Sequence, residues 1–160
     1  MMCPQVAHFS FLPPSESGEL SDDIRELFED LSRTLGSDPA GYPGQCRPLI
    51  DVFETDVAVE LVVDTCGVPA AALRILFRDG VLIVAGEKAP AGTTADAVFH
   101  LVERDFGRFA RAVRLSGAFD IGRARATLRA GELSVVLPKL LERRGRAHRV
   151  AVTTSDTPAA

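Results

Sequence analysis

Apolar residues recur at two spacings along the chain, and each spacing predicts a different kind of element. Between residues 21 and 35 the large apolar side chains lie three, four and seven positions apart, which is the spacing of one helix face. The members of this face are Ile24, Leu27, Phe28, Leu31 and Leu35. Ser21 is placed to cap such a helix and Gly36 to end it. We therefore expect an amphipathic helix over 21–35, whose apolar face needs a partner: its own domain, another subunit or a client protein.

From Pro48 to Pro138 the apolar positions alternate with polar ones, which is the period of half-buried strands. Seven short strand-like runs bounded by turn residues lie in this stretch: 49–54, 57–64, 73–78, 81–85, 106–115, 124–128 and 133–137. Asp79-Gly80 is a two-residue hairpin turn, and its register sets 77 opposite 82 and 75 opposite 84, with apolar residues at all four positions. Many short strands without a convincing helix among them predict an all-β, immunoglobulin-like β-sandwich.

One predicted strand carries a charge on its apolar face. Arg111 shares the face of Phe109 and Val113 in the run 106–115. A cation among apolar side chains is costly unless a carboxylate neutralises it. We therefore expect Arg111 to have an acidic partner.

Composition divides the chain into three parts. Residues 1–47 carry 8 acidic and 3 basic side chains, residues 48–138 carry 12 and 10, and residues 139–160 carry 2 and 5. We expect an N-terminal arm over 1–47, the sandwich over 48–138 and a C-terminal extension over 139–160. The formal net charge of -4 gives no reason to expect nucleic-acid binding, and no apolar run approaches the roughly 18 residues of a membrane span.

The search for chemistry yields little. The sequence contains no GxSxG, HExxH, CxxC or GxGxxG motif, so we expect no enzyme, no cofactor and no metal site. Cys3, Cys46 and Cys66 are odd in number and scattered, which argues against disulfides and favours a reducing, cytoplasmic location. The first residues lack the pattern of a signal peptide. A thiol-based enzyme at Cys66 is kept as an alternative, although no basic neighbour in sequence would activate that thiol.

Four segments resemble the small heat-shock protein (α-crystallin) family. They are PLIDVFETD at 48–56, VLIVAGEK at 81–88, ERDFGRFARAVRL at 103–115 and ARATLRAGELSVVLPK at 124–139. The last contains the family's A-x-x-x-x-G-x-L pattern as Ala126, Gly131 and Leu133. The sequence departs from the family at 65–67, where Thr-Cys-Gly replaces Leu-Pro-Gly, and at 116–117, where Ser-Gly replaces Leu-Pro.

The resemblance implies an ATP-independent chaperone, a holdase that binds unfolding proteins and assembles from dimers into larger homo-oligomers. Val150-Ala151-Val152 resembles the family's C-terminal anchor, with Val150 and Val152 expected to enter a groove beside Leu73, Ile75 and Phe77. It also implies that Arg111 lies at or near the dimer interface, and that residues 88–102, with Phe99, Leu101 and Val102, match a segment that crosses to the partner subunit.

Client capture requires apolar surface that can be exposed. The residues expected to bind clients are Phe9, Phe11, Leu12, Ile24, Leu27, Phe28 and Leu31. The alternative is an interaction module without holdase activity, like the CS-domain co-chaperones. Those proteins typically lack the arm helix and the tail anchor, so a monomeric state would favour that alternative.

Overall fold

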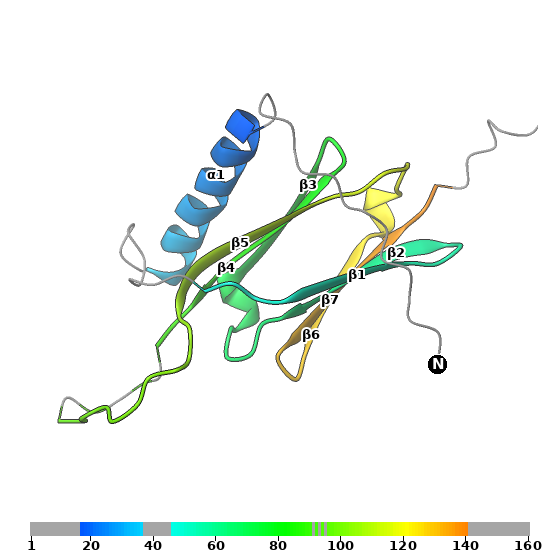
Figure 1. Ribbon diagram of the computed structural model, residues 1–160. Coiled ribbons are helices and arrows are strands. Elements are labelled where there is room, and N and C mark those ends of the chain that lie inside the picture. The colour runs from blue at the N-terminus through cyan, green and yellow to red at the C-terminus, as the bar shows by residue number, and fades with distance from the viewer. Residues whose placement is uncertain (1–16, 37–45, 91, 93, 95, 141–160) are drawn as a thin grey trace, which may run out of the picture.

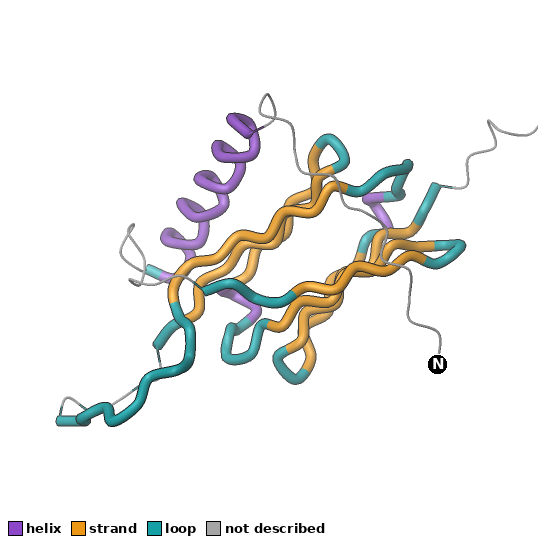
Figure 2. The backbone as a smooth tube through the Cα atoms, viewed as in Figure 1, coloured by secondary structure: helices purple, strands orange, loops and turns teal. Residues whose placement is uncertain are grey.

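The computed structural model describes residues 17–36, 46–90, 92, 94 and 96–140, which form two facing β-sheets with a helix on the outer side of one (Figures 1 and 2). Helix α1 spans Ser17–Leu35. The strands are β1 (Ile50–Glu54), β2 (Ala58–Asp64), β3 (Leu73–Arg78), β4 (Val81–Lys88), β5 (Gly107–Arg114), β6 (Arg125–Arg129) and β7 (Glu132–Pro138). Short 3-10 helices, η2 (Ala70–Ala72) and η3 (Ile121–Arg123), precede β3 and β6.

The sheets confirm the β-sandwich predicted from the seven strand-like runs. One sheet has the strand order β1-β2-β7-β6 and the other β3-β4-β5, and every strand pair is antiparallel. The β3–β4 hairpin has the predicted register, with residues 75 and 77 opposite 84 and 82. Asp79 and Gly80 adopt φ angles of 50° and 76°, the left-handed conformations that a two-residue hairpin turn of this kind requires.

The main core lies between the two sheets and is built from alternate residues of the strands. Leu61 and Val63 of β2 and Val84 of β4 have no exposed side-chain surface. Gly86 of β4 gives the ring of Phe109 room to pack, because a Cβ at residue 86 would lie only 2.4 Å from Cζ of that ring. The sandwich is therefore closely packed where β4 meets β5.

Helix α1 confirms the predicted helix but begins at Ser17 instead of Ser21, so Ser21 lies inside the helix and does not cap it. Gly36 has a φ of 61° and ends the helix as expected. The helix lies on the outer face of the β3-β4-β5 sheet, where it contacts β3, β4 and η2 (Figure 1). The sequence left three possible partners for the apolar face of this helix: its own domain, another subunit or a client protein. In the structure the helix packs against its own domain.

Candidate interaction surfaces

A second apolar cluster lies outside the main core, between α1 and the β3-β4-β5 sheet. Strand register places the outward residues Leu76 and Ile83 next to one another, and Ala85 follows on β4; we call these three the apolar panel. Ile83 and Ala85 are buried although neither belongs to the core between the sheets. Leu31 of α1 is likewise buried, with 0% of its side chain exposed. The helix therefore covers the apolar panel.

Two arginines of β3 bind acidic side chains of α1. Arg74 donates from Nε to Oδ2 of Asp30 at 2.5 Å and from Nη2 to the hydroxyl of Thr34 at 2.6 Å. Arg78 donates to the carboxylate of Asp23, which is buried. The hydrogen bond from Arg74 lowers the pKa of Asp30 below its ordinary value of 3.8, because it stabilises the ionised carboxylate.

Arg108 of β5 connects the sheet to the helix from the other side. Its Nε donates to Glu87 at 3.1 Å and its Nη2 donates to the hydroxyl of Ser32 at 2.6 Å. Its guanidinium carbon lies 5.4 Å from the centre of the Phe28 ring, a cation–π contact. Glu87 is only 2% exposed, so its charge requires a partner of this kind. A groove of about 630 Å³, lined in part by Ile24 and Phe28, runs beside Arg108 along the helix.

The residues predicted to bind clients divide into two groups. On α1, Leu31 is covered by the sheet and is not accessible in this arrangement, which differs from the expectation that the whole helix face is available. Ile24, Leu27 and Phe28 are only partly buried, so part of the face remains accessible. The others, Phe9, Phe11 and Leu12, lie outside the described residues.

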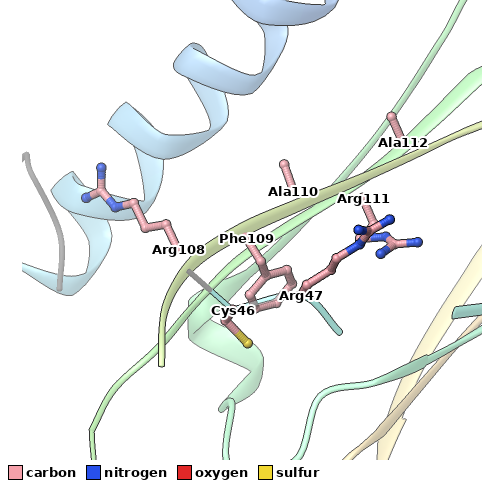
Figure 3. Close-up of a pocket in the computed structure, with 7 residues that line it drawn as sticks. All are labelled: Cys46, Arg47, Arg108, Phe109, Ala110, Arg111 and Ala112. Carbon is pink, nitrogen blue, oxygen red and sulfur yellow. The ribbon is translucent and has the colours of Figure 1, made fainter. Parts of the chain in front are cut away.

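A hollow of about 490 Å³ borders the edge strand β5, and two arginines meet there (Figure 3). The side chain of Arg108 points towards α1, whereas Phe109 and Arg111 point to the side of Cys46 and Arg47. The guanidinium groups of Arg47 and Arg111 lie next to each other. Burial is the larger cause that lowers the pKa of Arg111, and the neighbouring positive charge of Arg47 lowers it further.

Among the described residues, the hollow is lined by arginines and by no carboxylate. Within the described part of the chain, no carboxylate forms an ion pair with Arg111. The acidic partner expected from the sequence is therefore not among the described residues of this chain, and a carboxylate from a second chain would be favourable there. Burial also raises the pKa of the Cys46 thiol in the same hollow, which disfavours the reactive thiolate.

The segment between β4 and β5 extends away from the sandwich and carries exposed apolar side chains (Figure 1). Phe99, Leu101 and Val102 are 59%, 73% and 59% exposed. Among the described residues, strand β1 pairs on one side only, with β2, so its other edge is open. The structure therefore presents both an extended apolar segment and an open sheet edge, two features that favour pairing between chains.

The three residues predicted to receive the anchor lie on the edge strand β3. Leu73, Ile75 and Phe77 point towards the core between the sheets, where Leu73 is buried and the other two are partly buried. The ring of Phe77 packs edge-on against Phe119 with 5.8 Å between ring centres. The anchor residues Val150 and Val152 lie outside the described residues.

The arginine contacts to α1 were not predicted from the sequence. Alternation along β3 places Arg74 and Arg78 on the outer face, but no sequence signal connects them to carboxylates 44 and 55 residues away. The informative feature is the acidic polar side of the helix, which faces a strand with arginines on its outward positions.

Two classes of site are not found in the described part of the chain. No cluster of three or more His, Cys, Asp or Glu side chains there is arranged to hold a metal ion. No described helix is long and apolar enough to cross a membrane.

Two packed antiparallel sheets with open edge strands define the class of the protein, an α-crystallin-type β-sandwich. The comparisons with known proteins agree. Residues 51–153 match the Hsp20/alpha crystallin family. The chain is 34% identical to a 21.9 kDa heat shock protein of rice, over 94% of this chain and 79% of that protein. It is also 34% identical to the 16.9 kDa class I heat shock protein 1 of wheat, over 76% of this chain and 81% of that protein.

Solved structures show the same relationship. Heat shock protein 16.0 from Schizosaccharomyces pombe superposes with a TM-score of 0.58 and 27% identity, covering 68% of this chain and all of that one. A small heat-shock protein from Xylella fastidiosa gives a TM-score of 0.58 and 26% identity, covering 68% of this chain and 99% of that one. The chain belongs to the small heat-shock protein family, whose members are non-enzymatic chaperones that typically oligomerise and bind client proteins.

Proposed function

We propose that this chain is an ATP-independent holdase, which binds unfolding proteins, suppresses their aggregation and assembles from dimers into dynamic homo-oligomers. The observation that carries the proposal is the exposed apolar segment between β4 and β5, beside a sandwich with open strand edges. Family membership supports the chaperone activity. The free thiols of Cys46 and Cys66 are compatible with the same proposal in a reducing cytoplasm.

The dimer forms by exchange of the apolar segment. Phe99, Leu101 and Val102 of one subunit pair with the open edge of β1 in its partner, which buries side chains now exposed. Glu103 follows directly and is exposed. Its carboxylate is therefore carried across with the segment, where it can neutralise Arg111 of the receiving subunit.

Larger assemblies form through the tail. Val150 and Val152 insert beside Leu73, Ile75 and Phe77 of another dimer. Burial of two valines contributes about 3–6 kcal/mol before the cost of ordering the tail is subtracted. One anchor alone therefore binds with about millimolar affinity or weaker. Many anchors acting together hold a closed assembly while each can still exchange.

Clients bind where apolar surface becomes available. The candidates are Phe9, Phe11 and Leu12 of the arm and the accessible part of α1. Because hydrophobic attraction weakens on cooling, capture should strengthen on warming. Warming also unfolds client proteins, so the amount of unfolded client and the strength of its capture increase together.

The decisive experiment measures light scattering from a heat-unfolding client enzyme, with and without the full chain and in the absence of ATP. The mass of the free protein is measured in parallel by multi-angle light scattering. We expect suppressed scattering and a mass well above that of one chain. A monomer that leaves aggregation unchanged would contradict the proposal and favour a plain interaction module.

A paired variant tests the dimer. Phe99→Ser/Leu101→Ser should reduce the mass towards one subunit, because it removes the apolar surface that exchange buries. Ile121→Ser is the matched control, since Ile121 is 44% exposed but lies in η3, away from the exchanged segment. Equal masses for the paired variant and the control would exclude segment exchange as the basis of the dimer.

A further inference from the structure

The outer face of the β3-β4-β5 sheet combines an apolar centre with basic ends. Along β3 the outward residues are Arg74, Leu76 and Arg78, so the apolar side chain is flanked by two cations. On β5, Arg108 adds a third cation, opposite Glu87. This surface is complementary to an amphipathic helix whose apolar stripe is bordered by carboxylates.

Helix α1 shows how such a helix binds. Leu31 enters the covered cluster, while Asp23 and Asp30, seven residues apart, reach Arg78 and Arg74. Seven residues are two helical turns, so both carboxylates lie on the same side of α1 and each meets one arginine of β3. The contact therefore requires a particular pattern, two acids seven residues apart with a large apolar residue directly after the second.

The contact is also built so that it can open without unfolding the sandwich. Leu31 and Ile83 do not belong to the core between the sheets, so helix and sheet share only a small separate cluster. Each of the two ion pairs keeps one side chain about half exposed, 53% for Arg78 and 45% for Asp30, so water can reach these charges when the helix leaves. The free energy that holds α1 in place is therefore a fraction of the stability of the whole fold.

We propose that the outer face of the β3-β4-β5 sheet is a docking site for acidic amphipathic helices, and that α1 is its built-in occupant. Release of α1 frees the site for an acidic amphipathic segment of an unfolding protein. The statement about unfolding proteins rests on the proposed chaperone function, whereas the docking site and its occupancy by α1 do not.

The test uses the full chain and a fluorescein-labelled synthetic peptide with the sequence of residues 17–35. An opened variant, Asp23→Asn/Asp30→Asn/Leu31→Ser, changes only the helix and leaves every residue of the sheet in place. We expect it to bind the labelled peptide at least about tenfold more tightly than the unaltered chain, because loss of charged hydrogen bonds and a buried leucine frees the site. Fluorescence anisotropy measures the affinity.

Specificity is tested on both partners. A peptide carrying the same three substitutions should bind the opened variant about tenfold more weakly, and this control alters nothing in the protein. Adding Arg74→Gln/Arg78→Gln to the opened variant should weaken peptide binding to a similar extent. Adding Arg125→Gln/Arg129→Gln should not, since these exposed arginines lie on β6 in the other sheet.

Equal peptide affinity of the opened variant and the unaltered chain would overturn the inference. Binding that ignores the substitutions in the peptide would overturn it as well. If the opened variant binds the peptide as expected but does not suppress client aggregation, the docking site stands and the proposed function is what fails.

Discussion

The substitution Leu31→Ala should weaken the contact between α1 and the sheet and leave the stability of the sandwich nearly unchanged. The Leu31 side chain is fully buried, and Leu→Ala at such sites costs about 2–5 kcal/mol. We take the lower end, about 2 kcal/mol, because a docked helix can shift to fill part of the cavity. Since Leu31 lies outside the main core, the loss should appear as easier opening of α1, by a factor of about 30, with little change in the melting of the sheets.

Hydrogen–deuterium exchange, read by mass spectrometry, measures the opening of α1 and β2 separately. Leu61→Ala is the matched control, because Leu61 is also fully buried but lies between the sheets. It should lower the melting temperature by more than about 10 °C, whereas Leu31→Ala should raise exchange in α1 alone. Equal acceleration of exchange in α1 and β2 by Leu31→Ala would refute the reasoning, since the two would then form one cooperative unit.

Three further predictions concern the tail, the core and one carboxylate. Val150→Ser/Val152→Ser should reduce the oligomer mass measured by light scattering, and an unchanged large assembly would exclude the tail as an anchor. Gly86→Ala should destabilise the sandwich by about 1–3 kcal/mol in calorimetry, because its Cβ would meet Phe109 at 2.4 Å; an unaltered transition would contradict that packing. The carboxyl of Asp30 should titrate below its ordinary 3.8 in NMR, so its contribution to helix docking is present above that pH and is lost as the pH falls further; titration at or above 3.8 would contradict the contact to β3.

The sandwich could be predicted because its signals are local. Apolar runs and turn residues mark the strands, and the register predicted for the β3–β4 hairpin is the one observed. The helix start could not be placed from such signals. Ser21 followed by two aspartates is typical of a helix N-terminus, yet Asp23 instead pairs with Arg78 on the sheet. In the sequence, an acidic residue that makes a tertiary contact looks the same as one that stabilises the N-terminus of a helix through its dipole.

The interaction surfaces were predictable to different extents. Exposure of Phe99 and Leu101 agrees with a segment that has apolar residues but no strand partner among the described residues of its own chain. The burial of Leu31 was not predictable, because it depends on which surface the helix meets. That choice is set by side chains on β3 far away in sequence, and sequence periodicity gives no information about such distant pairs.

The basic ends of the apolar panel also limit what the panel can bind. Two uncovered panels from different chains would place their arginines face to face, and like charges brought together in an interface are strongly unfavourable. The carboxylates of an acidic segment would instead attract the same arginines, so the electrostatic interaction that disfavours a second panel favours this segment. An exposed apolar surface normally promotes association with copies of itself, and here the charge pattern opposes that association. The arginines that hold α1 would thus favour an acidic foreign segment over a second copy of the chain once the helix leaves.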